Sequence, residues 1–238
     1  MESSGNTGYT GERAVLRKEL YDSAMALLDK HGSFEEVYRF NDSIKSFEGK
    51  DCKVYLVAER TWDEGKSCYA IVCKGRVEGL SIAQFKKVRD NKEEMMKKMT
   101  NKMFTPYILE NPPGADAALL ANINLPFPMT NRSFMTCTYY NDMEDGSYWE
   151  AGSSKDTEAL VEQHKDKIKK NVVGTTHMNF TMLKDTEAGV EWSNVIMSDM
   201  NGSFPNAAKK KMTEKQAQQS HDRIHFMLTG QPREKQDK

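Results

Sequence analysis

The stretch Asp199-Met200-Asn201-Gly202-Ser203-Phe204-Pro205 marks the point where a strand-like pattern gives way to a long helical one. Residues 190–198, just upstream, form a short apolar run of the kind that predicts a β-strand. Residues 207–228, just downstream, have helical periodicity, and proline is well placed near a helix start. The stretch therefore predicts a last strand, a turn and a long closing helix.

The rest of the chain repeats these two patterns in a definite order. Residues 12–30 carry apolar side chains at helical spacing and predict an amphipathic first helix that stops near Gly32. Two further helical stretches are predicted from Ser81 to Met103, with a break near Asn91, and over residues 158–170. Strands are predicted over residues 53–58, 68–74, 118–125, 133–140, 147–152, 172–183 and 190–198. Helices at both ends and mostly consecutive strands between them indicate an α+β fold with a largely antiparallel sheet.

Composition limits the broad class of the protein. The 238 residues include 34 Lys and Arg against 35 Asp and Glu, a net charge of −1, which argues against a general nucleic-acid binder. No run of about 18 apolar residues is present, and the first residues lack the pattern of a secretory signal. We therefore expect a cytoplasmic protein with disordered tails at residues 1–11 and 230–238.

Neither a metal site nor a cofactor is expected. The cysteines are Cys52, Cys68, Cys73 and Cys137, and they lie in apolar runs without Cys-x-x-Cys spacing, as buried reduced thiols do. His221 and His225 are four residues apart, like the pair in a zinc protease helix, but aspartate follows the first histidine where that motif has glutamate. We interpret them as histidines on the surface of a helix.

Two motifs together resemble the StAR-related lipid-transfer (START) domain. Leu125-Pro126-Phe127-Pro128-Met129-Thr130-Asn131-Arg132-Ser133-Phe134 is similar to the family's Pro-rich loop that leads into an Asn-Arg-Asp-Phe-type strand, although Ser133 replaces the usual aspartate. The stretch at 199–205 resembles the family's Asp-x-x-Gly-x-x-Pro turn into its last helix. Both motifs occur in the family's order, and the resemblance covers residues 33–229, with residues 12–32 as the preceding helix.

The resemblance implies a helix-grip fold, in which a curved antiparallel sheet wraps around a long C-terminal helix and encloses an apolar tunnel. It also implies a non-enzymatic protein that binds one sterol, phospholipid, fatty acid or carotenoid and carries it between membranes through transient membrane contact. Two alternatives stay open: a cyclase- or hydrolase-type enzyme of the wider helix-grip superfamily acting on a hydrophobic substrate, and a scaffold without a ligand.

We choose candidate site residues from this resemblance and from the apolar, methionine-rich faces of the predicted strands. The alternative interpretation is that these faces form a solid core. The expected ligand-binding residues are Leu119, Ala121, Ile123, Phe134, Thr136, Thr138, Met178, Phe180, Met182, Met212, Ile224, Met227 and Leu228. Phe127 and Met129 are expected as solvent-facing gate or membrane-contact residues. Arg132, Asp199, Gly202 and Pro205 are expected to be structural.

One further expectation concerns the polarity of the tunnel. Sterol-handling START domains carry a second arginine six positions after the motif arginine, opposite an acid on the preceding strand. Those positions are Thr138 and, as its expected partner, Leu119. The resemblance thus implies a nearly uniform apolar cavity with no buried ion pair, with Thr136 and Thr138 as modest polar groups, and with weak selectivity for sterols.

Overall fold

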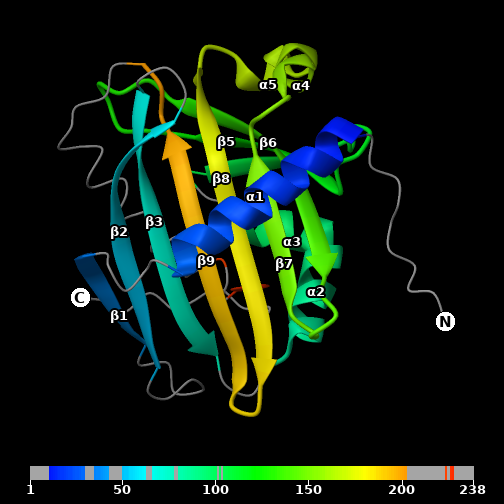
Figure 1. Cartoon of the computed structure of the whole chain (residues 1–238). Coiled ribbons are helices and arrows are strands. Elements are labelled where there is room, and N and C mark those ends of the chain that lie inside the picture. The colour runs from blue at the N-terminus through cyan, green and yellow to red at the C-terminus, as the bar shows by residue number, and fades with distance from the viewer. Residues whose placement is uncertain are drawn as a thin grey trace.

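A single large sheet organises the computed structural model, which describes residues 11–29, 35–42, 50–62, 66–77, 80–100, 102, 104–202, 223, 226 and 227 (Figure 1). Within these residues its nine strands are β1 (Glu35–Asp42), β2 (Lys50–Trp62), β3 (Lys66–Val77), β4 (Phe104–Leu109), β5 (Ala117–Ile123), β6 (Arg132–Asp142), β7 (Tyr148–Ser153), β8 (Val172–Thr186) and β9 (Gly189–Asp199). Their spatial order is β1-β2-β3-β9-β8-β7-β6-β5-β4, so β1 and β4 are the edges of an open sheet.

Neighbouring strands in this order are antiparallel, as their register shows. A short parallel pairing also joins the first residues of β6 to those of β8. The predicted α+β class with a largely antiparallel sheet is therefore confirmed.

One face of the sheet is covered by α1 (Gly11–Asp29), which lies across β7, β8 and β9 (Figure 1). Leu20, Ala24 and Leu27 of this helix are buried against Phe180 of β8 and Val195 of β9. We call this side of the sheet the α1 face. Two short helices, α4 (Glu158–Gln163) and α5 (Lys165–Ile168), contribute the buried Leu160 and Ile168 to the same core.

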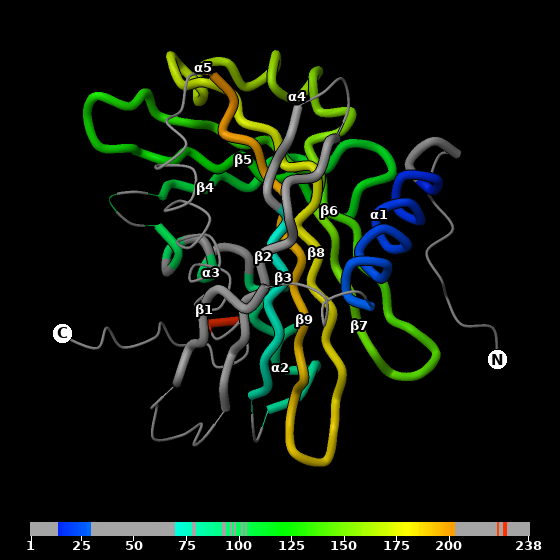
Figure 2. Tube along the Cα trace, turned by 60° about the vertical axis from the view of Figure 1, so that its left-hand side comes forward, coloured from blue at the N-terminus to red at the C-terminus, as the bar shows by residue number. Residues whose placement is uncertain are grey.

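The opposite side, which we call the inner face, packs against α2 (Ile82–Asp90) and against residues near the C-terminus. Phe85 of α2 shares a core with Trp192 and Ile196 of β9, and the helical residues Phe226 and Met227 are buried in the same cluster. Figure 2 shows α1 and α3 (Lys92–Met99) on opposite sides of the central strands β3, β9 and β8. The structure is therefore a sheet between two helical layers.

Within the described residues most predicted elements are correct, including the first helix and the helical break at Asn91, which separates α2 from α3. The helix predicted over residues 158–170 is divided into α4 and α5. The predicted closing helix over residues 207–228 and the predicted tails lie largely outside the described residues. Two edge strands, β1 and β4, were not expected from the sequence. Pro106 lies within β4, and proline is tolerated there because an edge strand need not donate every backbone hydrogen bond. None of the helices in the described residues is long and apolar enough to cross a bilayer.

Candidate ligand-binding face of the sheet

Cross-strand register identifies which predicted site residues share a face. Leu119 of β5 lies opposite Thr136 of β6, and Ala121 lies opposite Phe134. These β6 residues alternate in step with Tyr140, which packs into the inner-face core. The predicted residues that lie on the inner face are Leu119, Ala121, Ile123, Phe134, Thr136, Thr138 and Met227.

Three other predicted ligand-binding residues lie on the opposite side of the sheet. Met178 and Phe180 are fully buried in the α1 core, and Met182 packs against it. The ring of Tyr21 on α1 lies 6.1 Å from the ring of Phe180. The structure therefore does not bring these residues together with Met227, and on this strand the methionine-rich face is packed core, the alternative interpretation. Met212, Ile224 and Leu228 lie outside the described residues.

The register also corrects the expected partner of Thr138. Thr138 lies opposite Ala117, whereas Leu119 lies opposite Thr136, two residues further along. The predicted pair of positions is thus offset by two residues, although both side chains are on the inner face.

A row of buried polar side chains crosses the inner face, and the sequence analysis did not anticipate it. Glu150 of β7 lies opposite Thr181 of β8, which lies opposite Asn194 of β9. Their exposed fractions are 5%, 1% and 1%. The expectation of a nearly uniform apolar face is therefore wrong. The available signal was the placement of these polar residues within strongly apolar strands.

Asn194 is the most constrained member of this row. Its Nδ2 donates to the carbonyl oxygen of Phe180 at 2.7 Å and to Oγ1 of Thr181 at 3.0 Å. Because a backbone carbonyl can only accept, these bonds fix the orientation of the amide. The other end of the amide, Oδ1, is buried without a hydrogen-bond partner in the described part of the chain.

Glu150 links the sheet to the C-terminal segment. Its carboxylate forms an ion pair with the guanidinium of Arg223, and the side chain of Glu150 is only 6% exposed. The hydroxyl of Tyr148 donates to the same carboxylate at 3.5 Å and accepts from Nη1 of Arg89 at 2.7 Å. Burial, together with the charge of Glu150, raises the pKa of Tyr148 far above its ordinary value, so the phenol stays protonated. The inner face therefore contains a buried ion pair after all, although not at the expected positions.

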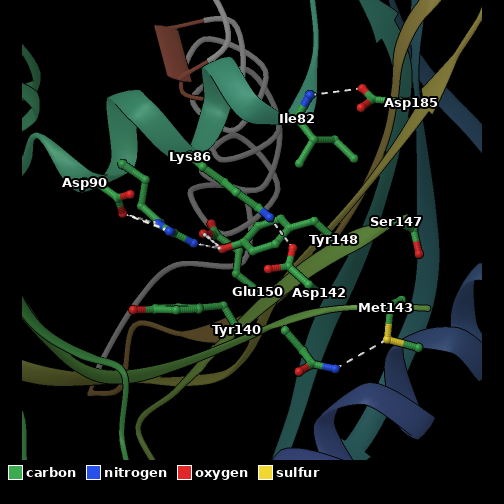
Figure 3. Close-up of polar contacts among 12 residues, drawn as sticks. Ile82, Lys86, Asp90, Tyr140, Asp142, Met143, Ser147, Tyr148, Glu150 and Asp185 are labelled. Atoms are coloured by element: carbon green, nitrogen blue, oxygen red, sulfur yellow. Dashed lines mark hydrogen bonds and ion pairs between the residues drawn. The ribbon is translucent and has the colours of Figure 1, made fainter. Parts of the chain in front are cut away.

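Helix α2 is attached beside this group (Figure 3). The backbone N–H of Ile82 donates to Oδ1 of Asp185 at 2.9 Å, and Lys86 pairs with Asp142. Tyr140, Tyr148 and Glu150 lie next to each other between α2 and the sheet in the same view. These contacts hold α2 over the end of the inner face that lies near the β8–β9 turn.

The predicted gate residues differ in their surroundings. Phe127 is 96% exposed at the tip of the loop before β6. Met129 is half-buried and packs against the small cluster of Leu125, Phe134 and Met200, so it is not the solvent-facing residue that was expected. The loop therefore presents one large apolar side chain to solvent.

Arg132 ties the start of β6 to the turn that follows β9. The buried guanidinium donates from Nε to the carbonyl oxygen of Met200 at 2.6 Å and from Nη2 to that of Asn201 at 3.1 Å. Oδ1 of Asp199 accepts from the backbone N–H of Asn201 at 2.8 Å, and Gly202 has a φ of +70°, which favours glycine. The two sequence motifs thus contact each other directly; Pro205 lies outside the described residues.

The thiols of Cys73 and Cys137 are free and buried. Burial raises the pKa of Cys73 to about 12, so this thiol stays protonated. The side chains of Cys52 and Cys68 lie outside the described residues, as do His221 and His225. Within the described residues, no group of three or more His, Cys, Asp or Glu side chains is placed to hold a metal ion.

No family model matches the sequence, and neither does any curated protein. Solved structures do match. Human StAR-related lipid transfer protein 5 superposes with a TM-score of 0.65 at 10% identity, over 93% of this chain and 99% of that one. Human STARD10 gives 0.61 at 11% identity, over 87% and 78% of the two chains. A STAR-related lipid transfer protein fragment from Xanthomonas axonopodis gives 0.53 at 15% identity, over 81% and 97%. The chain therefore has the START fold.

Proposed function

We propose that this chain binds one lipid-type ligand between the inner face of its sheet and its C-terminal helix. We further propose that it carries the ligand between membranes through the cytoplasm, without catalysing a reaction. The proposal rests on the fold that the chain shares with lipid-transfer proteins and on one packing observation.

That observation is an asymmetry between the two faces of β5 and β6. On the α1 face, Leu120, Met135 and Cys137 are at most 1% exposed. On the inner face, Ala121 and Phe134 are buried, but the alternate residues Leu119, Thr136 and Thr138 are only half-buried. Protein interiors are normally close-packed, so this loosely covered part of the inner face, opposite a tightly packed one, is where a ligand would complete the packing. Ligand sites of this kind are mostly apolar with a few polar groups.

The enzyme alternative has less support from the same face. A hydrolase or cyclase needs an acid or base that is free to exchange a proton with its substrate. Glu150, the buried carboxylate among the described inner-face residues, is already engaged by Arg223 and Tyr148. Binding without chemistry is therefore the better supported function.

Extraction of lipid from liposomes tests the proposal. Replacing Thr138 by Trp adds bulk to the half-buried inner face of β6, and we expect the variant to extract much less lipid than the original chain. The matched control is Asn141→Trp, at a half-buried position on the opposite face of the same strand. Equal extraction by both variants, at wild-type level, would contradict a ligand on the inner face.

A further inference from the structure

We infer that Asn194 and Thr181 recognise the head of the ligand, and that this head is uncharged and carries a hydroxyl group. This inference rests on the proposed function and makes it more specific. The two residues lie side by side on β8 and β9, in the buried polar row of the inner face.

The side-chain amide of Asn194 has an acceptor atom that no hydrogen bond within the described part of the chain uses. Oδ1 of Asn194 is buried, and no described residue donates to it. The amide cannot turn over to relieve this, since Nδ2 is held by the carbonyl oxygen of Phe180 at 2.7 Å. A buried carbonyl without a donor is costly, so native structures nearly always supply one.

The hydroxyl of Thr181 lies next to this amide. Oγ1 of Thr181 accepts a hydrogen bond from Asn194, at 3.0 Å. None of the described residues accepts the proton of this hydroxyl, so it remains a potential donor. The pair thus offers one acceptor and one donor close together. A hydroxyl group on a ligand can both donate to the first and accept from the second.

The negative charge of Glu150 disfavours an anionic head group on the ligand. An anionic phosphate or carboxylate has no proton to give to Oδ1 of Asn194, and it would lie in the same strand row as the carboxylate of Glu150. The cation nearest that carboxylate, Arg223, is already paired with it. A neutral hydroxyl avoids both penalties.

The position of the pair also fits a long ligand. Asn194 is on β9 and Leu119 is on β5, four strand spacings apart in the sheet order. At about 4.8 Å per spacing, this is about 19 Å along the sheet. An extended alkyl chain could therefore run from the polar pair toward the half-buried residues of β5 and β6.

Two compounds test the inference: hexadecan-1-ol and its methyl ether, in which a methyl group replaces the hydroxyl proton. Their affinities are measured by displacement of a fluorescent fatty-acyl probe from the full-length protein. The original chain should bind the alcohol at least about tenfold more tightly, because the ether leaves the buried acceptor unsatisfied. Asn194→Leu should reduce that ratio to near one, whereas the control Ser193→Ala, on the opposite face of the same strand, should preserve it.

The possible results separate a failure of this inference from a failure of the proposed function. Tight binding of both compounds with equal affinity would overturn the inference and leave the proposed function standing, with a trapped water as the partner of Asn194. A chain that binds neither the fluorescent probe nor the two compounds would overturn the proposed function and this inference with it, whereas a bound fluorescent probe that neither compound displaces would overturn the inference alone. A ratio unchanged in Asn194→Leu would also overturn the inference. If Asn194→Leu does not fold, Thr181→Val replaces it. Its ratio of affinities for the alcohol and the ether should be smaller than that of the original chain, and an equal ratio would overturn the inference.

Discussion

At the scale of single residues, close approaches within the sheet give the sharpest test of the packing. A methyl group at Gly174 would lie 2.4 Å from the ring of Phe134 and 3.0 Å from the carbonyl oxygen of Asp199. Gly174→Ala should therefore lower the free energy of unfolding by about 1–3 kcal/mol, as overpacking does. Urea denaturation measures the change.

The matched control is the substitution of Gly152 on β7, the strand next to β8. A methyl group at Gly152 would meet Oγ1 of Thr138 at 3.5 Å, an ordinary contact distance. Gly152→Ala should leave stability within about 0.5 kcal/mol of the original or increase it slightly. Adding Phe134→Leu should recover part of the loss in Gly174→Ala but not in Gly152→Ala. Equal losses in both alanine variants would show that Phe134 does not lie against Gly174.

The buried thiol of Cys73 should make the stability of the protein depend on pH. Burial raises the pKa of its thiol from 9.0 to about 12, so above pH 9 the unfolded chain loses this proton while the folded chain keeps it. Stability from this group is complete below pH 9 and falls by up to about 1.4 kcal/mol per pH unit as the pH rises toward 12. Urea midpoints at pH 8, 9, 10 and 11 should fall more steeply for the original chain than for Cys73→Ala. Parallel pH profiles would contradict this placement of Cys73.

The alternation of side chains predicted which residues share a face more reliably than it predicted which face they occupy. Leu119, Thr136 and Thr138 share one face of the sheet, the inner face, but Met178 and Phe180, which were grouped with them, lie on the α1 face. Alternation with a period of two shows which side chains of a strand lie on the same face, but it does not show which face of the sheet that is. A one-residue change of register moves all of these side chains to the opposite face. A bulge in β8 makes such a change: Thr176 lies opposite Ser198 and Met178 lies opposite Met197, so Thr176 and Met178 are on opposite faces although simple alternation groups them.

At the scale of elements, the ion pair between Glu150 and Arg223 fastens the C-terminal segment to the sheet. Removing either partner leaves the other without its counter-charge, and we expect Glu150→Gln and Arg223→Gln each to cost about 2 kcal/mol of stability. The double variant should cost less than the sum of the two, which a double-mutant cycle measures. Additive losses would show that the two side chains do not interact in solution.

The loop before β6 should affect the rate of lipid transfer more than the stability of the protein. Phe127 is 96% exposed, so replacing it by Ser removes little packing and should leave the unfolding temperature nearly unchanged. If the ring contacts the bilayer, the variant should transfer lipid between liposomes more slowly, by up to about thirtyfold, because about 2 kcal/mol of apolar burial is lost. Met129→Ser is the contrasting variant: its side chain packs against Leu125 and Phe134, so it should lower the unfolding temperature. An unchanged transfer rate in Phe127→Ser would contradict the membrane contact.

Elements were predictable where their pattern was long and regular. The first helix and the β8–β9 pair have many periodic residues and were found within a few positions. The edge strands β1 and β4 were missed because edge strands can carry proline and charge, as β4 carries Pro106 and β1 carries Glu35 and Arg39. The polar row of the inner face was missed because it exists only across strands, in the register of β7, β8 and β9.

At the scale of the whole molecule, α1 covers one face of the sheet, whereas the inner face packs against α2, Phe226 and Met227 and is where we propose that the ligand binds. Native mass spectrometry tests this most directly. The purified chain, incubated with liposomes of mixed phospholipids, fatty alcohols and sterols and then separated from them, should carry one lipid per chain, and Thr138→Trp should carry none. A folded chain that stays free of lipid throughout, or Thr138→Trp loaded as fully as the original, would contradict a ligand site on the inner face.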